Sequence, residues 1–491
     1  MELEKLSGVE LGRLVNHKEI SPREVIYYFR DRIQKFNPTL NAMTYTKFDE
    51  ALEDAEVIER KIMNGEDVGP LAGVPVGLKD FLDSKKGWTN SHGGVKSLIR
   101  TDVADSEFYK AASQLGAIAI GKTNAPAFGF SGACSNKMYG ATANPFDFTR
   151  TSGGSSGGSA SAVAGGLLTL AEAGDAGGST RIPAGWCNLF GMKASLGTIP
   201  SICRPDAWAA THPYCFNGAI TKTVEDSALM LSTMAHYDPR DPHSLPINAN
   251  KSFMQLMNKS IKGMKIAFTL DFDIYSDLVD PEVKQLVESA VNRFKEAGAE
   301  VEYVKFNFKH KLEEIMFCWA WAISIDTALD LDAWCKEGLN LVADHRDELP
   351  EEFIWFNDIA ASATIWDMRK FNEIRTDILD QFEDKLSKYD VIISPTAICK
   401  PMKHEDNGRC ISCNGHTLDS SLNFISFGET PLANFVGYPA ASVPAGLTSD
   451  GLPIGMQIIG KQYADEDVFA FARTFETIQP WRDNLNLSYL N

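Results

Sequence analysis

Two serine clusters surrounded by glycines lie close together in this chain. One is TSGGSSGGSAS at residues 151–161, and the other is GDAGGSTRIPAG at residues 174–185. A serine that attacks a carbonyl group needs a base to take its proton and hydrogen-bond donors for the oxyanion. The Ala176-Gly177-Gly178-Ser179 turn can supply such donors, because successive N–H groups in a tight glycine turn point into one concavity. Neither cluster contains a histidine, so the base must come from elsewhere.

Lys79 is the candidate base. It follows the apolar run VPVGL at residues 74–78, which predicts a short buried strand. Burial lowers the pKa of a lysine by up to about 3 to 5 units, which can leave the amine neutral near pH 7. Serine–lysine versions of the catalytic triad use such a base. Because most lysines are solvated surface residues, the residues alone predict no more than a possible serine acyl-transfer enzyme with a lysine base.

Three other interpretations of the first cluster are weaker. A flexible tether is disfavoured because the apolar run SASAVAGGLLTLAEAG follows directly and should be buried. A phosphate-binding loop requires a lysine where this chain has Ser159. A nucleophile elbow fits Gly154-Ser155-Ser156-Gly157-Gly158 in its letters. It also requires an apolar strand immediately before it, and ATANPFDFTRT is not one.

Nearly the whole chain resembles the amidase signature family of serine hydrolases. The resemblance rests on GVPVGLKDF, GKTNAPAFGF, YGATANPFDFTRTSGGSSGGSASAVAGG, GDAGGSTRIPAGWCNLFGMKAS and VGYPAASVPAGLTSDGLPIGMQIIG. It implies a triad in which Lys79 is the base, Ser155 relays the proton from a cis peptide bond, and Ser179 is the nucleophile. It also implies an oxyanion hole of backbone N–H groups at Ala176, Gly177, Gly178 and Ser179.

The resemblance extends to residues beside the triad. Asp175 and Arg181 are expected to brace the nucleophile turn, and Ser156 is expected to be a hydrogen-bonding neighbour of the reacting groups. Ala176 stands where the family usually has threonine, which removes a hydroxyl but keeps the backbone donor. No cofactor and no catalytic metal are expected.

The implied reaction is hydrolysis of a carboxylic amide C–N bond through an acyl-enzyme. Carbamate, urethane or ester hydrolysis is the nearest alternative, because the acyl chemistry is the same. The family also includes the amidase subunit of glutamine-dependent tRNA amidotransferases. That role is disfavoured, because such subunits usually carry glutamine where this chain has Ile182, and KASLGTIPS replaces their tyrosine-glycine-arginine sequence.

Two segments outside the shared motifs bear on substrate choice. EEIMFCWAWAISIDTALDLDAWC at residues 313–335 is rich in aromatic residues and predicts a core-facing helix. Its other interpretation is an apolar wall of the substrate pocket, with Cys318 among the lining residues. The loop Phe128–Cys134 matches a family segment that often borders the pocket. Both features favour apolar or aromatic amides over charged ones.

A third segment raises the question of a metal. Cys399, His404, Cys410 and Cys413 suggest zinc, but a single C-x-x-C pair is a weak signal, and reduced thiols on a variable loop are the default expectation.

The elements that position these residues alternate between helix and strand. Ser21-Pro22-Arg23-Glu24 is a capping box that opens an amphipathic helix toward Phe36. Helices are also expected over residues 48–64, over DSEFYKAASQLGA and after Asp280-Pro281, with Gly298 as a C-terminal stop. Strands are expected at GVPVGLKDF, AIAIG, KIAFTL, VEYVKF, DVIISP and LPIGMQIIG.

This alternation predicts an α/β fold with a central mixed, mostly parallel twisted sheet covered by helices on both faces. One large domain is expected. It divides into an N-terminal helical region at 1–70, a signature core at 71–235, a variable pocket-shaping region at 236–430 and a C-terminal return to the core at 431–491.

Composition limits the partners. The chain has 491 residues and a formal net charge of −18, which argues against nucleic acid or an anionic membrane surface. We expect a small-molecule amide as the substrate and no membrane partner, with a homodimer left open. No signal peptide or apolar span of about 18 residues is evident, and nine irregularly spaced cysteines favour reduced thiols in the cytoplasm.

Overall fold

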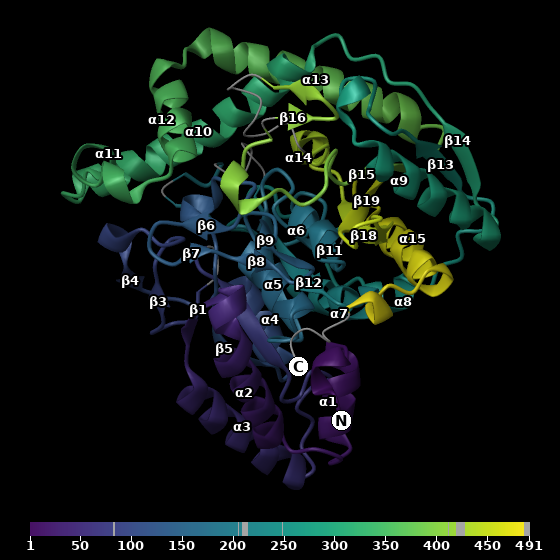
Figure 1. Ribbon diagram of the computed structural model, residues 1–491. Helices are drawn as coiled ribbons and strands as arrows, with labels where there is room; N and C mark the ends of the chain where they lie inside the picture. Colours follow the sequence, from purple (N-terminus) through teal and green to yellow (C-terminus); the bar gives the residue numbers. More distant parts are fainter. Residues whose placement is uncertain are drawn as a thin grey trace.

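The centre of the molecule is an eleven-stranded sheet (Figure 1). The computed structural model describes residues 1–491 except 82–83, 205, 209–214, 248, 411, 419–427 and 486–491. Across the sheet the strands follow the order β1 (Met43–Thr46), β5 (Ile118–Thr123), β2 (Pro75–Lys79), β10 (Leu170–Asp175), β12 (Phe216–Thr221), β11 (Phe190–Lys193), β18 (Ala440–Leu447), β19 (Pro453–Gly460), β15 (Val391–Pro395), β13 (Lys265–Phe268) and β14 (Glu300–Tyr303).

The sheet is mixed, and its parallel pairs lie on its two flanks. Strand β2 runs parallel to both β5 and β10, and β13 runs parallel to both β15 and β14. Between the flanks, β12, β11, β18 and β19 pair in antiparallel fashion, and β1 is antiparallel to β5 at one edge. Parallel neighbours end at the same edge of a sheet, so the carboxyl ends of β2 and β10 lie side by side.

Both faces of the sheet are buried by helices. Along β10, Ala171 and Ala173 pack into a core with α5 (Gly157–Ala164), whereas Leu170 packs into a core with α4 (Glu107–Gln114) and α7 (Val224–Met234). Successive strand residues point to opposite faces, so the alternation assigns these helices to opposite sides. This arrangement agrees with the expected α/β fold class.

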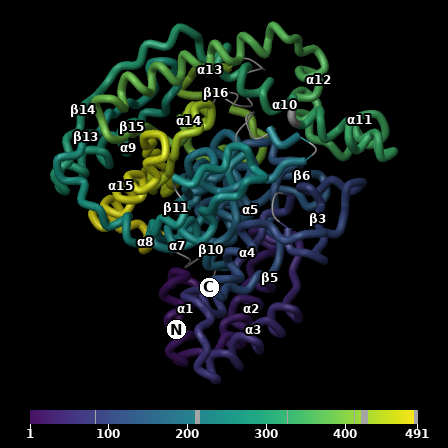
Figure 2. The backbone as a smooth tube through the Cα atoms, turned by 180° about the vertical axis from the view of Figure 1, so that it is seen from behind, coloured from purple at the N-terminus to yellow at the C-terminus, as the bar shows by residue number. Residues whose placement is uncertain are grey.

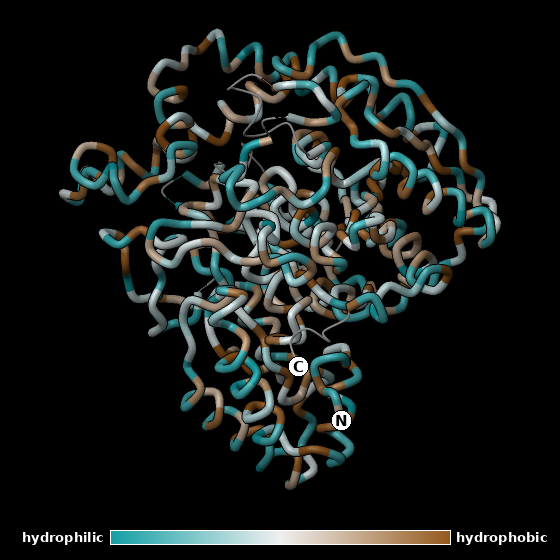
Figure 3. Tube along the Cα trace, viewed as in Figure 1, coloured by the Kyte–Doolittle hydropathy of each residue, from teal (hydrophilic) through white to brown (hydrophobic). Residues whose placement is uncertain are grey.

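The remaining helices extend the two ends of the molecule. Figures 1 and 2 show α1–α3 at one end and α10–α13 arching over the other. In the outer helices, hydrophilic and hydrophobic segments alternate along the chain (Figure 3), as expected for helices with one buried face. Their bounds are α1 Gly8–Asn16, α2 Pro22–Leu40, α3 Phe48–Met63, α6 Arg181–Trp186, α8 Phe253–Leu256, α9 Pro281–Arg293, α10 Leu312–Lys336, α11 Leu341–Asp344, α12 Glu351–Ser362, α13 Ile365–Leu386, α14 Pro431–Val436 and α15 Asp465–Ile478.

Short two-stranded ribbons complete the fold. They are formed by β3 (Thr89–Asn90) with β4 (Arg100–Thr101), β6 (Ser135–Asn136) with β7 (Gly140–Ala141), β8 (Ala143–Asn144) with β9 (Asp147–Thr151), and β16 (Ser412–Cys413) with β17 (His416–Thr417).

Several local signals act where the sequence predicts them. The capping box of Ser21 and Glu24 opens α2, which continues to Leu40, beyond the expected end. The side chain of Asp280 caps α9, and Gly298 ends the following turn with a φ of 81°. Over the described ranges, none of the helices has both the length and the apolar character needed to cross a bilayer.

Candidate active site

Lys79 lies at the carboxyl end of β2 and is fully buried. Its Nζ lies 2.8 Å from Oγ of Ser155 and 2.9 Å from Oγ of Ser156. The backbone N–H of Lys79 donates to Oε2 of Glu172 on the neighbouring strand β10, at 2.9 Å. The amine is therefore walled off from solvent and within hydrogen-bonding reach of the serine predicted to relay its proton.

Two opposing effects act on the charge of Lys79. Burial lowers the pKa of its amine below 10.5, because an ammonium ion loses hydration in the protein interior, while the nearby charge of Glu172 partly opposes this shift. The net shift is downward, toward the neutral amine that a general base must be.

The first serine cluster sits between β9 and α5. The Gly154–Ser155 peptide bond is cis, as the family resemblance implies. Next to it, the N–H of Ser156 donates to the carbonyl oxygen of Ser179 at 3.2 Å, and Oγ of Ser156 lies 3.3 Å from both N and O of Gly174. Ser156 thus connects Lys79 to the second serine cluster.

The second cluster forms the turn between β10 and α6. Gly178 has a φ of 121°, and a Cβ at this position would lie 2.0 Å from Oγ1 of Thr430, so only glycine fits. The N–H of Gly178 donates to Oδ1 of Asp175 at 2.7 Å. Within the described part of the chain, the N–H groups of Ala176, Gly177 and Ser179 have no acceptor. The N–H of Gly178 is therefore used within the turn, and the other three predicted donors remain available to a ligand.

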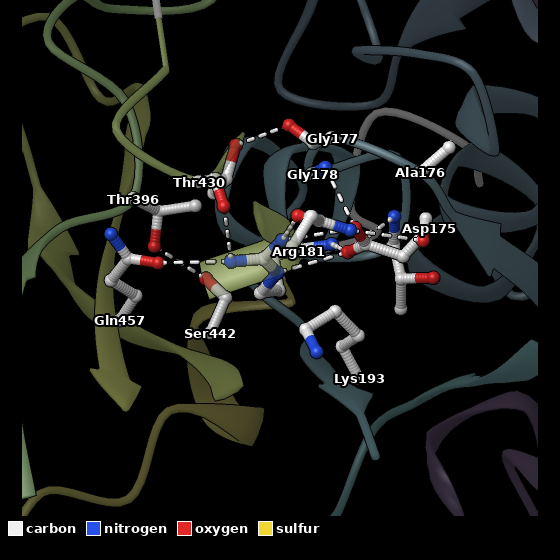
Figure 4. Close-up of polar contacts among 12 residues, drawn as sticks. Asp175, Ala176, Gly177, Gly178, Arg181, Lys193, Thr396, Thr430, Ser442 and Gln457 are labelled. Atoms are coloured by element: carbon white, nitrogen blue, oxygen red, sulfur yellow. Dashed lines mark hydrogen bonds and ion pairs between the residues drawn. The ribbon is translucent and has the colours of Figure 1, made fainter. Parts of the chain in front are cut away.

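A buried ion pair braces this turn (Figure 4). Nε and Nη2 of Arg181 each donate to a carboxylate oxygen of Asp175 at 2.9 Å. Nη1 of Arg181 reaches the carbonyl oxygen of Thr430 at 3.0 Å and Oε1 of Gln457 at 3.1 Å, and Nη2 also reaches Oδ1 of Asn434. Asp175 and Arg181 thus tie the turn to α14 and β19.

The ion pair sets the charge of Asp175. Burial by itself raises the pKa of this carboxyl group, but the charge of Arg181 and its hydrogen bonds outweigh burial and hold the pKa well below its usual range. Asp175 is therefore a permanent anion and serves as an anchor for backbone N–H groups.

A cavity of about 970 Å³ opens onto these residues. Lys79, Ser155 and Ser179 contribute to its floor together with Ala176 and Gly177. Apolar side chains form much of its wall, from Phe81, Phe128, Phe130, Ile182, Trp319, Ile323 and Phe356. The two sequence segments predicted to border a substrate pocket, the loop after residue 127 and the aromatic helix α10, both do so.

One detail of the α10 prediction is wrong. Cys318 does not line the cavity; it is buried in the main hydrophobic core on another side of the helix. The residue that faces the site is its neighbour Trp319, whose Nε1 donates to the carbonyl oxygen of Ala176 at 3.1 Å. Consecutive residues in a helix point about 100° apart, so an apolar run alone does not say which one meets the substrate.

Sequence reasoning missed three residues at the site. Glu172 supports Lys79, and Thr430 and Asn434 support the turn between β10 and α6, with Oγ1 of Thr430 donating to the carbonyl oxygen of Gly177 at 2.6 Å. A signal existed for Glu172, because a glutamate inside the buried run LLTLAEAG requires a polar partner. Thr430 and Asn434 come from a distant segment that carries no such local signal.

Comparison with known proteins places the chain in a family. The amidase family profile matches residues 24–469. The chain belongs to the amidase family. This amidase is 30% identical to an acylamidase of Rhodococcus erythropolis over 478 residues, which cover 97% of this chain and 96% of the relative. It is also 30% identical to a glutamyl-tRNA(Gln) amidotransferase subunit of Cyanothece sp. over 495 residues, covering 96% of this chain and 98% of that one.

Solved structures agree with this assignment. The crystal structure of a bacterial aryl acylamidase of the amidase signature family superposes with a TM-score of 0.93 at 36% identity, covering 98% of each chain. The structure of 6-aminohexanoate cyclic dimer hydrolase shares the fold, with a TM-score of 0.84 at 24% identity over 99% of this amidase and 100% of that chain. The protein is thus a hydrolase that acts on C–N bonds of amides other than peptide bonds, as the sequence predicts.

Proposed function

We propose that this amidase hydrolyses apolar or aromatic small amides as a free-standing enzyme, with Ser179 as nucleophile, Ser155 as proton relay and Lys79 as base. The observation that carries the proposal is the contact between the buried amine of Lys79 and Oγ of Ser155 at 2.8 Å, in a cavity that Ser179 also lines. A buried amine in contact with a hydroxyl group is the arrangement that general-base catalysis by lysine requires.

In the acylation step, the neutral amine of Lys79 takes the proton of Ser155, which takes the proton of Ser179 as Oγ of Ser179 attacks the amide carbonyl carbon. The developing oxyanion accepts hydrogen bonds from the free N–H groups of Ala176, Gly177 and Ser179. Each such donor is worth about 10²- to 10³-fold in rate. Ser155 then delivers a proton to the amide nitrogen, so that the C–N bond breaks and a neutral amine leaves, and Lys79 returns its proton to Ser155, which leaves the lysine neutral again.

Deacylation runs the same relay with water. A water molecule gives its proton to Ser155 as it attacks the ester carbonyl carbon of the acyl-enzyme, and Lys79 takes the proton of Ser155 in turn. Ser179 leaves with a proton returned through the relay, and the carboxylic acid is released. The ion pair of Asp175 and Arg181 keeps its charge throughout and holds the turn in place.

The cavity wall supports apolar and aromatic substrates. Aromatic rings and Ile182 surround the reacting groups, and the structurally similar aryl acylamidase and the acylamidase relative carry names consistent with such amides. Glu352 also lines the cavity, and burial raises the pKa of its carboxyl group. Asp330, Asp332 and Lys336 line the cavity as well, so its wall combines apolar side chains with polar ones and suits an apolar amide that carries a polar substituent.

Two alternatives remain open to experiment. Carbamates, urethanes and esters present a similar carbonyl group to the same nucleophile. A role within an amidotransferase complex has the support of relatives with that name, but Ile182 places an apolar side chain in the cavity where such subunits usually carry glutamine.

A substrate panel tests the proposal. Anilides, aliphatic amides, carbamates and esters are incubated with the purified wild type, with Ser179→Ala and with the surface control Ser387→Ala. We expect anilides to be cleaved best, Ser387→Ala to match the wild type, and Ser179→Ala to lose at least about 10³-fold in kcat.

A fluorophosphonate probe should label the peptide that contains residue 179 in the wild type and not in Ser179→Ala. Full activity of Ser179→Ala would show that the nucleophile is a different residue. A protein that hydrolysed glutamine and none of the panel substrates, and did so only when the other amidotransferase subunits were added, would instead favour the amidotransferase role.

A further inference from the structure

Three cysteine side chains gather on the loop that follows β15. Cys399 comes soon after the strand, Cys410 lies just before the β16–β17 hairpin, and Cys413 is the last residue of β16. Their three Sγ atoms lie within 4.8 Å of one another, and none of the three cysteines is in a disulfide. Cys410 and Cys413 are buried, and Cys399 is half-buried. The sequence suggests only the C-x-x-C pair; the fold adds a third sulfur from a separate turn of the chain.

The spacing of these sulfurs fits a thiophilic metal ion. Zinc binds thiolate sulfur at about 2.3 Å with tetrahedral geometry, which places neighbouring sulfurs about 3.8 Å apart. The observed separations of up to 4.8 Å need a closure of only about 1 Å to reach this geometry. Soft thiolate ligands favour zinc over magnesium or calcium, which take oxygen ligands.

We propose that Cys399, Cys410 and Cys413 bind one Zn²⁺ as thiolates, with His416 as the fourth ligand. Cys413 and His416 are directly paired across the β16–β17 hairpin. Directly opposite residues of an antiparallel pair point to the same face, with Cβ atoms about 4.5 to 5.5 Å apart. His416 is exposed and lies outside the group of three sulfurs, so its imidazole must turn about its side-chain torsions to reach the ion.

His404, the histidine that the sequence suggests beside these cysteines, is a poorer ligand. Its ring nitrogens do not lie within 4.8 Å of all three sulfurs. The ring instead lies against the backbone of Phe148 and near Asp147 on β9. Replacing His416 and replacing His404 are therefore expected to give different results in the same experiment.

Binding changes protonation in a defined way. One Zn²⁺ ion and three thiols give a zinc tris-thiolate, and three protons pass to solvent, while neutral His416 contributes an unprotonated ring nitrogen. No bond between sulfurs forms, and no oxidant is required.

The site would fix one wall of the cavity. Nη1 of Arg150 donates to the carbonyl oxygen of Pro401 at 2.7 Å. The N–H of Thr151 donates to the carbonyl oxygen of Met402 at 2.9 Å. These two bonds hold the loop that follows β15 against β9. Gly408 has a φ of 77°, and a Cβ there would lie 2.6 Å from Oγ of Ser131, which lines the cavity. A zinc ion between residues 399 and 413 would hold this loop against the pocket without taking part in the reaction.

Metal content tests the proposal. The full-length protein is expressed with added zinc, purified under reducing conditions, treated with a weak chelator and analysed by mass spectrometry of the metal. We expect one zinc per chain in the wild type and loss of zinc in Cys399→Ser, Cys410→Ser and Cys413→Ser. Cys335→Ser, which changes an exposed cysteine outside the cluster, should keep its zinc.

A cobalt titration of the apoprotein identifies the ligands independently of enzyme activity. Co²⁺ should produce thiolate-to-cobalt charge-transfer bands and the intense visible bands of a tetrahedral ion, and His416→Ala should weaken the visible bands while His404→Ala leaves them unchanged. Zinc should raise the melting temperature of the wild type but not of Cys413→Ser, because only a folded site binds the ion.

Two results would overturn the proposal. One is a wild type that holds no zinc and gives no cobalt bands although its circular dichroism spectrum is that of a folded protein. The other combines two observations. Two fewer thiols are titrated when the protein is kept without reductant, and the reduced protein binds no metal. That result would mean that the cluster forms a disulfide. Neither result bears on Ser179, so the proposed function stands or falls separately.

Discussion

At the scale of single residues, the protein environment of Lys79 makes a positive charge on its amine less favourable than in water. Lys79 is fully buried, and its contacts include the hydroxyl groups of Ser155 and Ser156 and the aromatic ring of Phe81, 5.1 Å from its amine. The anion that opposes the effect of burial most strongly is Glu172, which binds the backbone N–H of the lysine. Burial outweighs this attraction, so the pKa of Lys79 lies below its usual value and the amine loses its proton more readily than it would in water.

Replacing Lys79 by alanine should change the pH dependence of the reaction. In the wild type, kcat/KM should rise with pH as the lysine loses its proton, and should stay high above the lowered pKa. Lys79→Ala should lose far more activity near neutral pH than at strongly alkaline pH, where hydroxide partly replaces the base.

Initial rates on one anilide across a pH series measure this effect, with the exposed Lys86→Ala as a control. An equal loss at every pH would mean that Lys79 has only a structural role.

The sequence predicts the residues of the site better than their hydrogen bonds. Lys79, Ser155 and Asp175 lie in motifs whose residue types already indicate chemistry. The prediction of Gly178 as an oxyanion donor does not include the hydrogen bond from its N–H to Asp175, because the path of the turn decides which N–H groups find an acceptor within the protein. Thr430 could not be predicted, because it reaches the turn from a segment far away in the chain.

At the scale of elements, α10 connects the cavity wall to the turn that carries the proposed nucleophile. Trp319 lines the cavity and donates to the carbonyl oxygen of Ala176, so one side chain touches both the pocket and the backbone that carries the proposed oxyanion donors. Capped helices such as α2 and α9 could be predicted because their signals are local. The order of the strands could not, because it depends on pairing between distant segments such as β10 and β12.

Trp319→Phe separates the two roles of this residue. The substitution keeps an aromatic wall and removes one hydrogen bond, which is typically worth about 0.5 to 1.5 kcal/mol. We expect kcat to fall by about 2- to 10-fold with little change in KM, whereas Trp319→Ala should change both.

Steady-state kinetics on an anilide measure this split. Trp366→Phe makes the same substitution at an exposed position and should leave both constants unchanged. A rise in KM without a fall in kcat for Trp319→Phe would assign Trp319 to substrate binding alone.

At the scale of the whole molecule, buried lysines make stability depend on pH. Burial lowers the pKa of Lys193 to about 7 and that of Lys222 to about 8. In the unfolded chain these amines keep their ordinary pKa of about 10.5. Between the two values the unfolded state binds more protons than the folded state, so the free energy of unfolding rises with pH in this window.

Lys193→Met isolates one of these contributions. The free energy of unfolding of the wild type, minus that of the variant, should increase from about pH 7 toward pH 10, with a slope of at most about 1.4 kcal/mol per pH unit. Urea unfolding followed by circular dichroism measures the difference, and Lys388→Met, at an exposed lysine, should show no such trend. A difference that stays constant with pH would mean that Lys193 is charged in the folded protein.

The orientation of α10 about its axis turns one face of the helix toward the cavity. Trp319, Ile323 and Thr327 are spaced four residues apart, so they share one helical face, and all three line the cavity. Of these three, Trp319 is the one bonded to the turn of the proposed nucleophile. We therefore expect libraries that randomise positions 323 and 327, while keeping the tryptophan, to change which amides are accepted with less effect on turnover than changes at Trp319.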